Sequence, residues 1–179
     1  PQAHKKALIV DERFNRGGLI ADYYINIMRQ PLMSCHATRY GKDVCNPHII
    51  RGPKVMITDE TAGSGGDLLP WMFRESKLGT LVGRRTWGGL VGILGFPVLM
   101  DGGFITAPNI ALYGKEGWIA ENVGIPPDVE VEQWPKAVLA GKDPQLEKAI
   151  EIVLDQLKKA PPQLPKRPPY PRPRQSVGK

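Results

Sequence analysis

One serine flanked by small residues is the feature of this sequence most able to do chemistry. Ser64 lies at the centre of the segment 62–66, which reads Ala-Gly-Ser-Gly-Gly. A nucleophilic serine needs small neighbours, because only then can a tight turn expose its hydroxyl. An apolar run precedes the turn at 55–58, and apolar residues recur at helical spacing after it: Leu68, Leu69, Met72 and Phe73. We therefore predict a strand, a turn that carries a nucleophile, and a helix.

The same turn has a plainer explanation. A Gly-Ser turn in which Ser64 or Asp67 caps the following helix requires no catalysis. Under the catalytic interpretation, the free N–H groups at the start of the helix point back at the turn, where they could stabilise an oxyanion. The residues of the turn alone leave both explanations open.

The elements that must position this serine follow a repeated order. Residues 6–11 predict a strand, 13–18 a turn rich in glycine, and 19–28 a helix. Residues 55–73 repeat strand, glycine-rich turn and helix. Such alternation predicts an α/β fold in which both turns lie at the same edge of the sheet.

Further elements complete the expected organisation. A third inner strand is expected at 80–83, and short strands joined by turns at 91–113. Asp143 and Pro144 are typical of a helix start, and an apolar stripe continues from there to Ala160. We divide the chain into a core at 1–142, an amphipathic helix at 143–160 and a tail at 161–179. The tail, rich in proline, should be extended, either docked on a neighbour or solvated.

Composition narrows the class of protein. The chain has 179 residues, 41% of them hydrophobic, which is enough for one domain with a core. Five of its basic residues lie in the tail: Lys166, Arg167, Arg172, Arg174 and Lys179. The formal charge of +6 is therefore mostly a property of the tail, and we expect no nucleic-acid partner.

No segment reaches the roughly 20 apolar residues that span a bilayer, so we expect no membrane association. The chain begins with Pro1, without an initiator Met or secretory signal, and is expected to be a piece of a longer protein, cytoplasmic or alternatively periplasmic.

Two cysteines lie ten residues apart in a predicted loop, and they have several possible states. Cys35 and Cys45 could form a disulfide or remain as thiols. His36 and His48 lie near them, so a metal site is conceivable. The short Cys-x₂₋₄-Cys spacing of zinc sites is missing, and we expect neither a metal nor an organic cofactor.

Four segments in order resemble the superfamily of C-terminal-processing peptidases and tricorn proteases. Residues 11–18 match its D-x-R-x-N-x-G-G signature, and the turn at 62–67 falls where these enzymes keep their nucleophile. Residues 82–89 and 120–129 are similar to tricorn-type core segments. The resemblance implies a Clp/crotonase-type fold of strand-strand-helix units, a serine endopeptidase that acts through an acyl-enzyme, and a homo-oligomer.

The resemblance also implies roles for single residues. Ser64 would be the nucleophile, and the N–H groups of Gly17 and Gly65 would form the oxyanion hole. The processing branch activates its serine with a lysine in a T-F-G-K-G segment, and that position is Gly89 here. The chain is therefore more similar to the tricorn branch, in which a histidine is the base and a second serine and a glutamate, Glu121 here, orient it.

Two departures from the branch matter for function. Its catalytic histidine lies well upstream of the signature, whereas only His4 precedes the signature here, at the end of the chain. We therefore expect the base to come from upstream, in a protein with propeller and peptide-binding domains, and this chain to be almost inactive by itself. No Asp or Glu lies between Asp22 and Asp43, so a preference for basic residues before the cleaved bond does not carry over.

Two rival functions remain. A crotonase-type acyl-CoA enzyme shares the fold and uses backbone oxyanion holes, but it needs neither Ser64 nor the 11–18 signature. A non-catalytic scaffold would use the basic tail to recruit partners.

Overall fold

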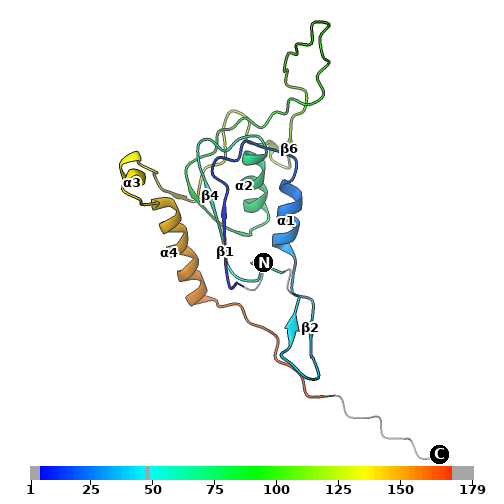
Figure 1. Cartoon of the computed structure of the whole chain (residues 1–179), viewed down its shortest axis with the longest axis vertical. Coiled ribbons are helices and arrows are strands. Elements are labelled where there is room, and N and C mark those ends of the chain that lie inside the picture. Colours follow the sequence, from blue (N-terminus) through cyan, green and yellow to red (C-terminus); the bar gives the residue numbers. More distant parts are fainter. Residues whose placement is uncertain (1–4, 47–48, 171–179) are drawn as a thin grey trace, which may run out of the picture.

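A computed structural model describes residues 5–46 and 49–170 of the chain (Figure 1). Its centre is a four-stranded sheet with the order β1-β4-β5-β8, in which each neighbouring pair is parallel. The strands are β1 (Leu8–Asp11), β4 (Lys54–Thr58), β5 (Gly79–Gly83) and β8 (Val129–Glu130). The α/β fold with a parallel sheet is confirmed, and the three inner strands expected from sequence are among its members.

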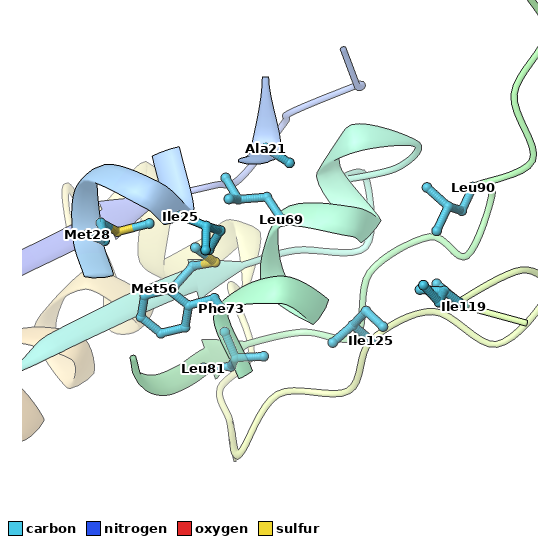
Figure 2. Packing of buried hydrophobic residues seen from close by; sticks show 11 residues of the cluster. Ala21, Ile25, Met28, Met56, Leu69, Phe73, Leu81, Leu90, Ile119 and Ile125 are labelled. Atoms are coloured by element: carbon cyan, nitrogen blue, oxygen red, sulfur yellow. The ribbon is translucent and has the colours of Figure 1, made fainter. Parts of the chain in front are cut away.

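Helices cover both faces of this sheet. On one face, α1 (Ala21–Arg29) and α2 (Gly65–Glu75) pack over Met56 of β4 and Leu81 of β5. Figure 2 shows side chains of the two helices packed around Met56 of β4. The opposite face presents Val55, Ile57 and Val82 to α4 (Pro144–Lys159). Every residue of β4 is buried, as expected for a parallel strand enclosed on both sides.

The C-terminal helix α4 begins where the sequence predicted it. The Asp143 side chain accepts a hydrogen bond from the Leu146 N–H, and Pro144 occupies the first turn, where its missing N–H costs nothing. Sequence patterning missed a short helix just before it, α3 (Pro135–Leu139). Residues 161–170 follow without regular structure, and the rest of the predicted tail lies outside the described residues.

A small hairpin projects from the body beyond α1 (Figure 1). It consists of β2 (Cys35–His36) and β3 (Val44–Cys45), which pair antiparallel. A disulfide joins Cys35 to Cys45, which decides between the alternatives left open by the sequence. Within the described part of the chain, no group of three or more His, Cys, Asp or Glu side chains could hold a metal ion, and His48 is not described.

The strands expected at 91–113 are largely wrong. Between β5 and the small pair β6 (Tyr113–Gly114) and β7 (Gly117–Trp118), the structure has an extended loop with one isolated bridge, Gly92 to Ile110. In Figure 1 this loop reaches far from the body. An apolar run forms a strand only where a neighbouring strand can pair with it, and no such neighbour is available here. None of the described helices is long and apolar enough to cross a membrane.

Candidate active site

Ser64 sits at the junction between strand and helix, in a backbone conformation unusual for a residue with a side chain. It directly precedes α2, and its φ is 58° and its ψ −117°. A positive φ strains any residue other than glycine, and such strain gathers at functional sites because the surrounding structure must enforce it. The predicted nucleophile therefore occupies a sharp turn after β4, with its side chain half-buried.

Buried hydrogen bonds enforce this turn. The Asp59 carboxylate accepts from the N–H groups of Thr61 and Ala62, and also from the N–H of Phe14 in the signature loop. The Gly63 N–H donates to the Asn15 carbonyl oxygen at 2.9 Å. The two glycine-rich turns are thus bonded to each other on the side of the sheet where both were expected.

Glycine is required where these two turns meet. A Cβ atom added to Gly17, whose φ is 116°, would lie 2.7 Å from the Ser64 Cβ and 2.9 Å from its Oγ. A Cβ on Gly65 would lie 2.4 Å from the Gly18 carbonyl oxygen. Both distances are shorter than any side chain tolerates. The structure therefore brings Gly17, Gly65 and Ser64 together, as the sequence predicted.

The two predicted oxyanion donors differ in their present hydrogen bonds. The Gly17 N–H donates to the Asn15 Oδ1 at 2.9 Å. The Gly65 N–H takes part in none of the hydrogen bonds that join described residues. Only one of the two donors is therefore free in this arrangement.

Asp67 is the main buried anchor of the site, beyond the helix cap foreseen from sequence. Its carboxylate accepts from the N–H groups of Ser64 at 2.9 Å, Gly88 at 2.8 Å and Gly89 at 3.1 Å, and from the Thr86 hydroxyl. The side chain is fully buried. A buried carboxylate is tolerable only when donors surround it, and here those donors are the elbow and the loop 86–89.

Glu121 reaches the serine through that same loop. Its Oε2 accepts from the N–H groups of Leu90 at 2.8 Å and Val91 at 2.7 Å. The preceding residue, Gly89, accepts the Ser64 N–H at 3.0 Å. No hydrogen bond between described residues joins Glu121 to Ser64 directly, so the carboxylate lies beside the elbow without contacting its hydroxyl.

Arg13 of the signature has a structural task. Its guanidinium binds Asp11 and, at 2.9 Å, Asp143 at the start of α4. The guanidinium lowers the pKa of Asp143 to about 2. The ion pairs tie the end of β1 to the C-terminal helix.

A buried acid lies next to the glycine turns, and sequence reasoning missed it. Glu12 is only 6% exposed, and burial raises its pKa to about 7. It lines a cavity of about 600 Å³ together with Asn15, Gly17 and Gly65, and the remaining wall is mainly apolar. Position 12 falls in a free position of the signature, so only its burial could have revealed it.

Trp87 is a second residue that the sequence did not single out. A Cβ on Gly63 would lie 2.5 Å from its ring, so the indole covers the turn, yet it is 66% exposed. Its ring is therefore an exposed aromatic surface beside the serine predicted to be the nucleophile.

Among the described residues, histidine occurs only at position 36. The chain contains three, of which His4 and His48 lie outside the described residues. His36 is on the projecting hairpin, in β2. The described residues thus provide a nucleophile position, a free N–H donor and a carboxylate.

Known proteins with similar sequences are proteases. Residues 1–131 match the model of peptidase family S41. The chain is 40% identical to the tricorn protease of Thermoplasma volcanium and 39% identical to that of Thermoplasma acidophilum, over 93% and 91% of its length. It spans only 16% and 15% of those two proteins.

A solved structure is similar over most of the fold. A crystal structure of the tricorn protease matches 86% of this chain, with a TM-score of 0.81 and 39% identity, while the chain covers 15% of it. The match to the family model extends over the signature turn, the serine elbow and the Glu121 segment. By sequence and by fold, the chain belongs to peptidase family S41.

Proposed function

We propose that this chain is the nucleophile-bearing part of a tricorn-type serine endopeptidase, which cleaves peptides through an acyl-enzyme on Ser64. The observation that carries the proposal is the strained elbow, in which Gly17 lies so close to Ser64, and Gly65 so close to Gly18, that neither Gly17 nor Gly65 could hold a Cβ. Membership of a peptidase family favours this function over an acyl-CoA enzyme of the same fold.

In the proposed reaction, the Ser64 Oγ attacks the carbonyl carbon of the peptide bond while its proton passes to a base. Negative charge collects on the former carbonyl oxygen, where the Gly65 N–H, and the Gly17 N–H once it is released, would stabilise it. The base then protonates the departing amine, and an acyl group stays on Ser64. A water molecule, deprotonated by the same base, hydrolyses the acyl-enzyme.

The base itself would come from another part of the protease. We expect a histidine from upstream of this chain, oriented by Glu121, with propeller and peptide-binding domains in the same protein. The short share of the relatives that this chain spans supports such a division. Under this proposal the core at 1–142 works with the upstream domains, within a cytoplasmic homo-oligomer without metal or organic cofactor.

A fluorophosphonate probe tests the nucleophile directly. In the full-length protease the probe should label Ser64, and Ser64→Ala should abolish labelling and peptide turnover while leaving the thermal unfolding temperature nearly unchanged. Ser34→Ala, on the segment before the projecting hairpin, is the matched control and should be labelled normally. Unchanged turnover by Ser64→Ala would remove this serine from the mechanism.

A further inference from the structure

Asn15 makes hydrogen bonds both within the signature turn and to the serine elbow. Its side-chain Nδ2 donates to the Glu12 carboxyl, and its Oδ1 accepts the Gly17 N–H at 2.9 Å. Its own carbonyl oxygen accepts the Gly63 N–H at 2.9 Å. One residue therefore grips the signature turn with its side chain and the serine elbow with its backbone.

The hydrogen bond from Gly17 to the Asn15 side chain occupies an N–H group that the proposed reaction needs. An oxyanion hole works best when its donors already point at the reacting oxygen and have no other partner. The Gly65 N–H has no other partner among the described residues, whereas the Gly17 N–H has one, because the Asn15 amide oxygen accepts it. An oxyanion is charged and accepts hydrogen bonds more strongly than a neutral amide, so it could take the Gly17 N–H from Asn15.

We propose that Glu12 and Asn15 are positioning residues, which keep the Gly17 N–H on the Asn15 amide until an oxyanion forming at Ser64 takes it. The inference rests on the proposed function of Ser64. It adds a step in which the hole is completed only as the reaction begins. Glu12 does not touch substrate in this scheme and acts through Asn15.

The surroundings of Glu12 make its grip on Asn15 sensitive to pH. The titratable groups nearest to it are Asp11 on the same strand, Asp59 after β4, and Tyr24 of α1 in the same cavity wall. The wall contributed by α2 is formed by uncharged residues, Gly65 and Leu69. Arg13 is directed at Asp11 and Asp143 instead. Burial and two neighbouring carboxylates together raise the pKa of Glu12 to about 7.

Ionisation of Glu12 should tighten the grip. A carboxylate accepts the Asn15 Nδ2–H more strongly than a neutral carboxyl group does. An amide that donates a stronger hydrogen bond becomes a better acceptor at its oxygen, because hydrogen bonds in a chain polarise one another. The Asn15 Oδ1 therefore holds the Gly17 N–H more firmly above neutral pH than below it.

Nuclear magnetic resonance of this chain tests the linkage without any need for catalysis. The ¹H and ¹⁵N shifts of the Gly17 amide, followed from pH 5 to pH 9, should move with the same midpoint as the Glu12 side-chain carboxyl carbon. The movement should vanish in Glu12→Gln, which keeps an acceptor for Asn15 but cannot ionise. Glu60→Gln, an exposed acid in the elbow segment, should keep it.

The wild-type titration decides the matter even if Glu12→Gln fails to fold. A Gly17 amide that does not follow the ionisation of Glu12 would overturn the proposal.

The full-length protease gives the second readout. The rate at which fluorophosphonate labels Ser64 should fall about threefold to tenfold relative to the Glu12→Gln variant between pH 6 and pH 8.5, with kcat for peptides affected and KM hardly changed. Labelling with an identical pH profile in both proteins would overturn the positioning role and leave the nucleophile intact. Absence of labelling in both proteins would instead reject the function of Ser64. The Gly17 titration would then still test the link between Glu12 and Gly17.

Discussion

On the Gly17 side of Ser64 the chain packs backbone against backbone, whereas on the other side the loop that follows Gly89 begins at two N–H groups, those of Leu90 and Val91, which the Glu121 carboxylate accepts. The first side is closed by glycines that leave no room for a Cβ. The second leads within a few residues into a loop with many exposed apolar side chains: Ile93, Leu94, Val98, Leu99, Met100, Phe104 and Ile105. The difference teaches that, under the proposed function, the described residues supply the nucleophile and one N–H donor, whereas the base is expected from another part of the protease.

The largest effect is expected when peptide hydrolysis by this chain is measured with and without the region that should supply the base. Residues 1–179 alone should hydrolyse peptides no more than in traces, and joining the upstream region should restore turnover by roughly 10⁶-fold, the typical cost of losing a triad histidine. Fluorogenic peptide assays on both proteins measure this. Strong cleavage by the chain alone, lost in Ser64→Ala, would place the base within these residues.

Crowding the closed side should give the next largest effect. Gly17→Val and Gly17→Pro, in the full-length protease, should lower kcat by roughly 10² to 10³ with little change in KM, since each displaces or removes a donor to the oxyanion. Sequence alone suggests Gly17→Ala as a mild variant, but the structure corrects this, because its Cβ would lie 2.7 Å from the Ser64 Cβ.

Gly117→Ala is the matched control for Gly17, because its φ is nearly the same, 119° against 116°, and nothing lies within 4 Å of the added Cβ. It carries the same backbone strain without touching the elbow, so kcat should be retained. If the Gly17 variants change only KM and keep kcat, the loop serves folding instead of catalysis.

Removing the Asp67 carboxylate, which joins the serine elbow to the loop 86–89, should destabilise the fold. Asp67→Ala removes the acceptor of the Gly88 and Gly89 N–H groups and of the Thr86 hydroxyl, while the Ser64 N–H keeps the Gly89 carbonyl oxygen. We expect the substitution to lower the free energy of unfolding by about 3 kcal/mol. Urea unfolding of the chain measures this. Asp101→Ala, which loses one exposed bond to the Gly103 N–H, should change the stability by less than about 0.5 kcal/mol. Equal effects of the two variants would contradict the role given to Asp67.

The smallest expected effect concerns the pH dependence of stability. The pKa of Glu12 is raised by folding to about 7 from an ordinary 4.5, so its neutral form is favoured in the folded state. The associated stability is present below pH 4.5 and is lost as pH rises through 7, by roughly 3 kcal/mol at most. Urea unfolding at pH 5 and pH 8 should show this loss in the wild type and its absence in Glu12→Gln. A similar loss in both proteins would assign it to other groups.

The sequence predicted those features that a few neighbouring residues determine. A glycine forced by a tight turn and a serine between small residues are visible in a few neighbouring positions, so the elbow at 62–66 and the turn at 13–18 were found. Asp143 with Pro144 is equally local, and α4 was found with it. The expectation that both turns lie at the same edge of the sheet followed from the alternation of strand and helix.

Features that depend on contacts between distant parts of the chain could not be predicted from local sequence. Glu12 and Asp67 are ordinary acids until the fold buries them, and Asp67 finds its donors Thr86, Gly88 and Gly89 in a distant segment of the chain. The run at 91–113 has the composition of strands, but strands need neighbours that composition does not reveal. The roles of Ser64, Gly65, Gly17 and Glu121 in catalysis remain predictions.

The link between Arg13 and Asp143 has a consequence for any shortened form of the protein. The match to the family model ends at residue 131, yet the helix that covers Val55, Ile57 and Val82 begins at Pro144. A truncation placed at the end of the family match would remove the helix that covers this face of the sheet and leave Arg13 with Asp11 as its only ion-pair partner among the described residues. Proteolytic loss of α4 should therefore disturb the signature turn from a distance, because it exposes the sheet and removes the Asp143 anchor of Arg13.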